Sequence, residues 1–430
     1  MARTAGPALS IAAVKDGAVL YAHGFGMARL EERRAATSYT LYNIASLTKQ
    51  FTATCVLLLA REQRFQLDEP VAKFFPKLPH ADGVTLRHLL THTSGYTDYY
   101  PLGYPDAEKL RDATPDEIVQ RYASFPLQFE PGSTWSYSNT GYHILGRVIE
   151  AASGLPFADF LTDRVLRPVD MRSAFFNDPP RVTEAHASGY TRFCLGPLRP
   201  APAERAGWMY ASGGLAASVD DLAQWCIALL DHRILNEAEL ASMMTPFRLN
   251  DGTNAPTAMG WFVERHDPQM LVLHSGGLSG FSTQIVTLPA QRIAVILLGN
   301  GDHLQVGLIA RTLLEELTGT PFPPAPVAHR HDTELKALVA WARRFQSGKI
   351  RDEHLTGPMR AFLNAERAAD ARQGLRSLGS IVDASVEGAG ERGGMRWIKA
   401  RLRGSEAKAD VLMRAAADNR LAEFGAYPVP

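Results

Sequence analysis

The sequence predicts a mixed α/β protein of the α+β type, in which an antiparallel sheet flanked by helices lies beside a mainly helical lobe. Two observations support this prediction. Strand-like segments occur near the start of the chain and again after Met259, so both ends of one domain can contribute to a single sheet. A proline-rich stretch then separates a smaller set of helices and strands, which we interpret as a small C-terminal α+β domain.

The first elements are a hairpin and a long helix. Residues 9–14 and 18–23 are strand-like and are separated by an Asp-Gly turn. Gly24 and Gly26 are expected to end this pair of strands. Residues 46–62 are strong helix formers of mostly apolar character, which indicates a buried central helix.

The middle of the chain is rich in proline and predicts a lobe of short helices. These helices are expected at residues 85–91, 114–124 and 141–152. Ser218 followed by Asp221 is a capping-box pattern, which starts a helix that runs to Leu230. Four strands are then expected at residues 260–264, 270–274, 281–288 and 292–298. An amphipathic helix over residues 304–317 closes the first domain.

The division into domains follows from the proline-rich stretch. We expect a first domain over residues 1–318, a linker over 319–331 and an accessory domain over 332–430. The accessory domain is predicted to contain helices at residues 333–346 and 366–378, and strands at residues 380–387, 395–402, 409–413 and 421–427.

Composition excludes several classes of partner. The chain has 430 residues, and its 45 Lys and Arg are balanced by 45 Asp and Glu, which disfavours nucleic acid and anionic membranes as partners. No segment approaches the ~20 apolar residues that a membrane span needs. The cysteines Cys55, Cys194 and Cys226 lack the close spacing of a zinc site and are expected to be buried thiols.

The cellular location is not encoded in an obvious way. No secretory signal pattern is visible, because the apolar residues 8–14 lead directly into Lys15 and a turn. The expected location is the periplasm or the exterior if a leader has been removed, and otherwise the cytoplasm. The sequence leaves the oligomeric state open.

Ser46 and Lys49 form an S-x-x-K motif at the start of the predicted buried helix. This spacing on a helix places the hydroxyl and the amine on one face, about a turn apart. A neutral lysine can activate a serine nucleophile, and burial favours the neutral form. The motif alone is weak evidence, because Ser405 and Lys408 repeat it in the accessory domain, where we interpret it as surface decoration.

A second motif can supply proton transfer and substrate binding. Tyr137 and Asn139 form the sole Y-x-N pattern of the sequence, in a loop before a predicted helix. A phenol beside a lysine can relay a proton to a leaving group, and an amide can hold a substrate carbonyl. An ordinary tyrosine at a helix cap is the competing interpretation.

A third motif follows the second of the late strands. His274 is followed there by Ser275, Gly276 and Gly277, and these residues are expected to line one edge of a cleft. The backbone N–H groups of Gly277 and Ser46 are our candidates for an oxyanion hole, which is usually the main electrostatic contribution in acyl transfer.

These motifs occur in one order, together with the segment Leu-Leu-Thr-His-Thr-Ser-Gly at residues 89–95. In this arrangement the chain resembles the serine β-lactamase and penicillin-binding-protein superfamily. It is most similar to the class C-like branch, which includes family VIII esterases and D-amino-acid peptidases. The resemblance covers roughly residues 8–318, and it implies a β-lactamase-like fold that needs no cofactor.

The resemblance also implies roles for single residues. Ser46 would be the acylated nucleophile, and Lys49 and Tyr137 the acid/base pair. Asn139 would anchor the substrate. The third family motif usually begins with lysine, whereas this chain has His274, which is mostly neutral above its ordinary pKa of ~6.5 and attracts a carboxylate less strongly. Hydrolysis of ester or amide bonds, in esters, β-lactams or D-amino-acid peptides, is therefore expected, with esters favoured.

Two other functions compete with this one. The chain could be a penicillin-binding sensor that is acylated but turns over poorly, or it could be a true β-lactamase. The accessory domain could mediate dimerisation or cover the cleft. The expected partner in each case is a small-molecule ester, β-lactam or peptide, and no nucleic acid.

Other patterns carry less weight. Ser212 lies in a Tyr-Ala-Ser-Gly-Gly segment that resembles a family loop at the border of the cleft, so it is a candidate substrate contact, although a role in a tight turn fits as well. His88 and His92 lack the glutamate of an H-E-x-x-H motif, and no metal site is expected. A G-x-S-x-G elbow is absent, which argues against an α/β-hydrolase.

Overall fold

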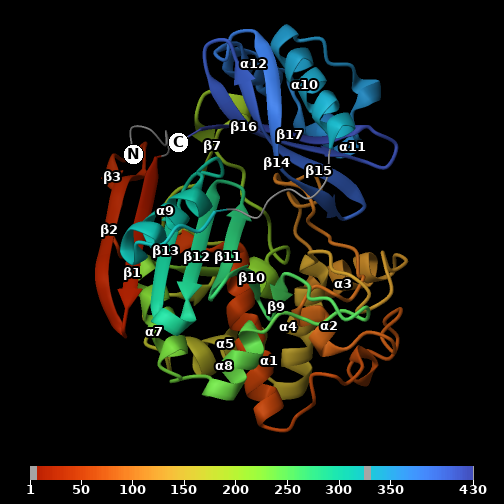
Figure 1. The fold of residues 1–430 in the computed structure, drawn as a ribbon. Helices are drawn as coiled ribbons and strands as arrows, with labels where there is room; N and C mark the ends of the chain where they lie inside the picture. Colours follow the sequence, from red (N-terminus) through yellow and green to blue (C-terminus); the bar gives the residue numbers. More distant parts are fainter. Residues whose placement is uncertain (1–6, 324–330, 430) are drawn as a thin grey trace.

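An eight-stranded antiparallel sheet organises the larger part of the molecule, with the strand order β3-β2-β1-β13-β12-β11-β10-β9 (Figure 1). The strands are β1 (Ala8–Lys15), β2 (Ala18–Arg29), β3 (Arg34–Ala35), β9 (Thr257–Ala258), β10 (Trp261–His266), β11 (Gln269–Leu278), β12 (Phe281–Leu288) and β13 (Ile293–Gly299). The structure is a computed structural model and describes residues 7–323 and 331–429. β1 pairs with β13 along its length, which confirms that both ends of this region share one sheet.

Helices cover both faces of this sheet. Every residue of β12 and β13 is buried, because successive side chains point to opposite covered faces. Ile296 packs into the core that contains α7 (Val219–Leu230), whereas its neighbours Val295 and Leu297 pack with α9 (Val306–Thr318). The predicted capping box of Ser218 starts α7.

A lobe of helices lies beside the sheet, as the sequence predicts (Figure 1). Its helices are α1 (Thr48–Arg61), α2 (Leu86–Leu90), α3 (Pro115–Ala123), α4 (Asn139–Ser153), α5 (Phe157–Leu161), α6 (Tyr210–Gly213) and α8 (Glu237–Met244). α1 is buried from its first residue to Leu59, because it packs against α4, α5 and α6. This burial is what a mostly apolar helix without a polar face requires.

In the larger part of the molecule, two strands extend four or more residues beyond their predicted ends. β2 continues through Gly24 to Arg29, because a Cβ atom at Gly24 would lie 2.5 Å from the backbone of Ala36. Glycine therefore permits a close approach there instead of ending the strand. β11 likewise continues beyond His274 to Leu278.

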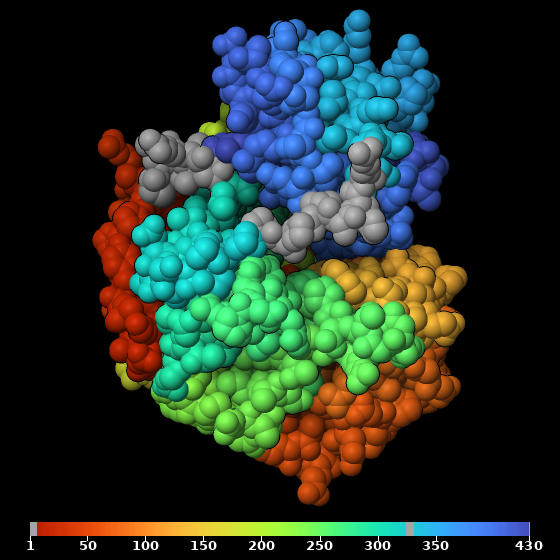
Figure 2. All heavy atoms as spheres, in the orientation of Figure 1, coloured from red at the N-terminus to blue at the C-terminus, as the bar shows by residue number. Residues whose placement is uncertain are grey.

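The C-terminal domain has its own antiparallel sheet, in the order β14-β15-β16-β17, and it lies across one end of the larger part (Figure 2). Its elements are α10 (Asp332–Ser347), α11 (Gly357–Phe362), α12 (Ala365–Arg376), β14 (Ile381–Arg392), β15 (Met395–Gly404), β16 (Lys408–Ala415) and β17 (Leu421–Pro428). β14 ends five residues after the predicted strand 380–387, and α11 was not predicted. Residues 324–330 of the predicted linker lie outside the described residues.

The two regions are joined by a shared core. Leu102, Tyr104 and Cys194 come from the larger part but pack within the hydrophobic core of the C-terminal domain. All three cysteines are buried free thiols, as expected. Within residues 7–323 and 331–429, no helix has the length and apolar character needed to cross a membrane.

Candidate active site

Ser46 lies in a short 3-10 turn, Ala45–Leu47, that leads directly into α1. Strands β11 and β12 of the neighbouring sheet pack against this turn and fix its position. Thr283 on β12 donates a hydrogen bond of 2.9 Å to the carbonyl of Ile44. A Cβ atom at Gly276 would lie 2.4 Å from that same carbonyl, so glycine is required for the close approach of β11. Ser46 is therefore held between a helix end and a rigid sheet.

Lys49 lies one turn further along α1 and is fully buried. Its Nζ atom is 3.2 Å from Ser46 Oγ, 2.7 Å from Asn139 Oδ1 and 2.7 Å from the carbonyl oxygen of Ser212. A neutral amine has two N–H donors and one lone pair. The two oxygens that can only accept occupy both donors, and this leaves the lone pair for the Ser46 hydroxyl.

Burial lowers the pKa of Lys49 well below its ordinary range. Asp98 opposes this shift, because a nearby carboxylate favours the ammonium form, and Arg392 adds to it through repulsion of like charges. The net direction favours the uncharged base that activation of a serine requires.

Tyr137 places its ring at the centre of the site. The ring stacks on His92 at 4.3 Å between centroids, and Lys49 Nζ lies 4.9 Å from its centre. The hydroxyl is buried and has no hydrogen bond of ordinary geometry with a described residue. Burial raises the pKa of this phenol, and the nearby Ser46 hydroxyl lowers it by less. The phenol is thus protonated and close to the Ser46 hydroxyl, as a proton donor at this site would have to be.

His274 faces the same cleft as a neutral ring. Its Nδ1 atom is 2.6 Å from the carbonyl oxygen of Ser275, and because a carbonyl can only accept, Nδ1 carries the proton. Burial is the main cause that lowers the pKa of His274 to about 3. The third motif therefore supplies no positive charge to this cleft.

The structure brings the other predicted residues to this place in different ways. Asn139 begins α4, and its side chain bonds to Lys49 and Asp98, so it positions the Lys49 amine as well as bordering the cleft. Ser212 lines the cleft, but its hydroxyl donates to the Met209 carbonyl in a tight turn. Ser275 and Gly277 also line the cleft.

Gly276 differs from these neighbours. It is buried under the cleft against Ile44 and Thr283, and it is not a lining residue. Our prediction that Gly276 borders the substrate was therefore wrong in detail, because alternate residues of a strand point to opposite faces. A Cβ atom at Gly277, in contrast, would meet nothing within 4 Å.

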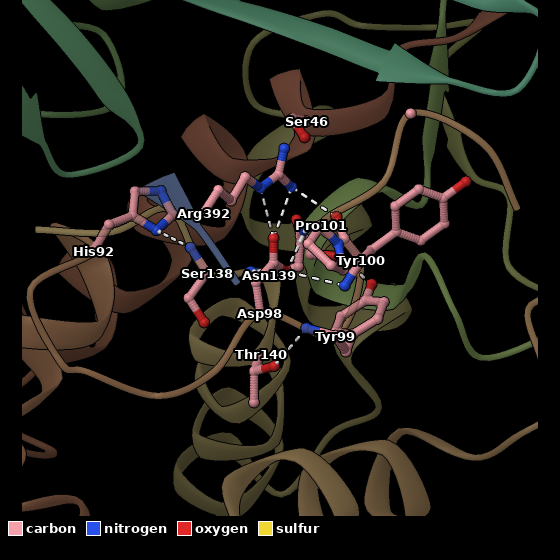
Figure 3. Close-up of polar contacts among 12 residues, drawn as sticks. Ser46, His92, Asp98, Tyr99, Tyr100, Pro101, Ser138, Asn139, Thr140 and Arg392 are labelled. Carbon is pink, nitrogen blue, oxygen red and sulfur yellow. Dashed lines mark hydrogen bonds and ion pairs between the residues drawn. The ribbon is translucent and has the colours of Figure 1, made fainter. Parts of the chain in front are cut away.

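Sequence reasoning missed two charged residues, Asp98 and Arg392. Asp98 is buried and accepts hydrogen bonds from both the backbone N–H and the side-chain amide of Asn139, each at 3.0 Å. Arg392, at the end of β14 in the C-terminal domain, reaches over this carboxylate, and its Nε atom is 2.8 Å from Asp98 Oδ2 (Figure 3). The Asp98 carboxylate follows the Thr-Ser-Gly segment closely, but no local signal marks Arg392.

The cleft encloses about 470 Å³ between the two regions. Aromatic rings form much of its wall. They come from both regions and are Tyr99, Tyr100, Trp135, Tyr137, Phe262, Phe281, Trp397 and Tyr427. Ser46 and Arg392 both line it. A cavity of this size accepts a compact ligand with an apolar group.

The histidines considered as metal ligands have other partners. His88 accepts a hydrogen bond from the Thr85 N–H in a capping box, and His92 Nδ1 accepts one of 3.1 Å from the Ser138 N–H. Within the described part of the chain, no cluster of three or more His, Cys, Asp or Glu side chains is arranged to hold a metal ion.

Comparisons with known proteins identify the family of this chain. The model of the beta-lactamase family matches residues 1–319. Penicillin-binding protein 4* of Bacillus subtilis (strain 168) is 31% identical over 309 residues, which are 68% of this chain and 68% of that protein. A D-aminopeptidase of Gluconobacter oxydans (strain 621H) is 28% identical over 75% of this chain, and the match spans 61% of the length of that enzyme.

A solved structure is similar over both regions. The octameric penicillin-binding protein homologue from Pyrococcus abyssi superposes on 99% of this chain and 97% of its own, with a TM-score of 0.67 and 23% identity. This likeness extends the shared fold to the C-terminal domain. The chain therefore belongs to the beta-lactamase family of serine hydrolases.

Proposed function

We propose that Ser46 forms an acyl-enzyme with an ester or amide substrate, and that Lys49 is the base of this step. The observation that carries the proposal is the contact of 3.2 Å between Ser46 Oγ and a fully buried Lys49 amine whose other two neighbours are oxygen acceptors. This arrangement directs the amine lone pair at the hydroxyl proton.

The reaction follows from these positions. Lys49 takes the hydroxyl proton while Ser46 Oγ bonds to the substrate carbonyl carbon, and the carbonyl oxygen becomes an oxyanion. The backbone N–H groups of Ser46 and Gly277 stabilise this oxyanion. Tyr137 then donates a proton to the leaving alcohol or amine as the carbonyl re-forms, and it recovers a proton from Lys49. Water releases the acyl group by the same steps in reverse order.

The substrate we propose is an ester or amide of an apolar acyl group, with the amides of D-amino acids as the amide class. The aromatic wall of the cleft favours the binding of an apolar acyl group. The neutral His274 gives the carboxylate of a β-lactam no cationic partner at the third motif. The similarity to a D-aminopeptidase supports the choice of the D-configuration for the amino-acid amides. Turnover of β-lactams is expected to be weak.

A substrate panel combined with mass spectrometry tests this proposal. Wild type should hydrolyse p-nitrophenyl butyrate. It should hydrolyse D-aminoacyl p-nitroanilides faster than the L-aminoacyl p-nitroanilides, and it should hydrolyse nitrocefin slowly. A fluorophosphonate should add one adduct to Ser46 and none to Ser46→Ala. Equal labelling or equal turnover by Ser46→Ala would refute the proposal. A substrate adduct that persists without turnover would favour the acylated sensor instead.

A further inference from the structure

We propose that the C-terminal domain completes the catalytic site, because its Arg392 neutralises Asp98 and so leaves Lys49 free to act as an uncharged base. Arg392 is in this view a positioning residue, since it touches Asp98 and Tyr137 and acts on Lys49 through them. The inference rests on the function proposed above and concerns how the same site is controlled.

The first support is a continuous line of contacts from one domain to the other. Arg392 Nε is 2.8 Å from Asp98 Oδ2, and Asp98 Oδ1 accepts the side-chain amide of Asn139 at 3.0 Å. Asn139 Oδ1 in turn accepts Lys49 Nζ at 2.7 Å, and Lys49 reaches Ser46. Each link is a direct hydrogen bond.

The second support is that the arginine is held firmly in place. Its Nη2 atom donates to the Tyr100 carbonyl at 2.7 Å, and its guanidinium lies 4.7 Å from the centre of the Tyr137 ring. The following residue, Gly393, has a positive φ of 59° and approaches Pro101 so closely that a Cβ atom would lie 2.7 Å from it. The hairpin turn therefore fits the catalytic part closely.

Further contacts hold the two domains together near this turn. Glu423 accepts the Gly103 N–H at 3.0 Å, and the hydroxyl of Tyr104 donates to the Ala422 carbonyl at 2.8 Å. The Arg392 side chain is 23% exposed, whereas that of Asp98 is 0% exposed. A carboxylate this deeply buried needs a positive partner.

The third support is the balance of charge around Lys49. The titratable groups that face it from the surrounding elements are Tyr137, Tyr142, His92, His143, His274, Asp98 and Arg392. Burial lowers the pKa of all three histidines and raises that of both tyrosines, so these five are uncharged near neutral pH. Asp98 and Arg392 remain as the charged pair of this set.

The consequence of losing one member of the pair follows from electrostatics. Without Arg392, Lys49 would be the cation nearest to the buried Asp98 carboxylate along the line of hydrogen bonds. The carboxylate would then favour the ammonium form of Lys49. An ammonium has no lone pair for the Ser46 proton. The base would then become active only at higher pH.

The experiment compares pH profiles of kcat/KM, whose acidic limb reports the pKa of the base in the free enzyme. In Arg392→Gln the acidic limb should move to higher pH, and at a pH on that limb kcat/KM should fall ~10-fold for each unit of displacement, because the neutral fraction there changes tenfold per pKa unit. The double variant Asp98→Asn with Arg392→Gln should return the limb towards its wild-type position, because both charges are gone. Arg392→Lys should lie between wild type and Arg392→Gln.

The control is an arginine–aspartate pair at the other end of the same hairpin. Arg403 pairs with Asp383 at the surface, and Arg403→Gln should leave the profile unchanged. Melting temperatures of all variants separate folding from catalysis. If Arg392→Gln melts early, the double variant and Arg392→Lys carry the test, because a purely structural anchor would not be restored by Asp98→Asn.

Two outcomes would overturn the inference. One is an Arg392→Gln profile that coincides with that of wild type, and the other is a double variant displaced as far as the single one. The proposed function fails by a different result, which is activity retained by Ser46→Ala. An inactive Ser46→Ala beside an unaltered Arg392→Gln would therefore reject the inference alone.

Discussion

The chain contains the S-x-x-K pattern twice, and the structure treats the two copies in opposite ways. Ser46 and Lys49 lie on the 3-10 turn and first turn of a buried helix, with 3.2 Å between hydroxyl and amine. Ser405 lies in the exposed turn between β15 and β16, where its hydroxyl accepts the Ser380 N–H at 3.0 Å, and Lys408 begins β16 exposed to solvent.

The difference shows that the motif acquires chemistry from its surroundings. A helix places positions i and i+3 on one face, whereas a turn followed by a strand does not. Burial favours the neutral form of a lysine side chain, whereas exposure to water does not. The same four-residue pattern is therefore a buried hydroxyl–amine pair, which we propose to be nucleophile and base, in one domain and part of a surface turn in the other.

The strongest way to break this comparison is to remove each serine. Ser46→Ala should lower kcat for ester hydrolysis by ~10⁴-fold or more, since the proposed acyl-enzyme forms on this hydroxyl. Ser405→Ala should leave kcat unchanged within error. Steady-state rates with p-nitrophenyl butyrate measure both. A comparable loss from the two variants would mean that the buried site is not the place of reaction.

The two lysines extend the comparison to the base. Lys49→Met should lower kcat/KM by ~10³-fold, within the range that general-base catalysis contributes. Lys408→Met changes the same residue type at the surface and should have no effect on kcat/KM. The melting temperature of each variant serves as the folding control. A fully active Lys49→Met would require a different base in the cleft.

Parts of this arrangement were accessible from the sequence because they depend on local pattern. The predicted strand 281–288 coincides with β12, since a run of apolar and β-branched residues is bounded by turn residues. The helix that carries Lys49 was likewise predicted from its composition. The three motifs named the polar residues that the structure brings to one cleft.

Other parts depend on contacts that no local pattern contains. The strand predicted at residues 380–387 ends before Gly388, whereas β14 continues, and Cβ atoms at Gly388 and Gly390 would lie 3.4 and 3.0 Å from the Trp397 ring across the hairpin. Glycine there makes room for an aromatic ring. The pairing of Arg392 with Asp98 joins residues 294 positions apart, and it exists because two domains dock.

Tyr137, the proposed proton donor, gives a smaller effect that sharpens the comparison further. Tyr137→Phe keeps the ring that stacks on His92 but removes the hydroxyl, and we expect a loss of ~10²-fold in kcat for amides. Esters with a good leaving group should lose less, because their leaving oxygen needs little protonation. The ratio of the two losses, measured with an anilide and a p-nitrophenyl ester, checks this role. Equal losses would indicate that Tyr137 only shapes the cleft.

The last test uses the free energy of unfolding, for which the expected difference between Lys49 and Lys408 is smallest. Because burial depresses the pKa of Lys49 in the folded chain, the unfolded chain binds one more proton at pH values between this pKa and the ordinary value near 10.4. Stability should therefore rise with pH across this window, with up to ~1.4 kcal/mol per pH unit from this residue. Urea unfolding of wild type at several pH values from neutral to alkaline should show this slope, and Lys49→Met should lose it. Lys408→Met should keep the wild-type slope, and a slope unaltered by Lys49→Met would mean that the buried amine stays charged.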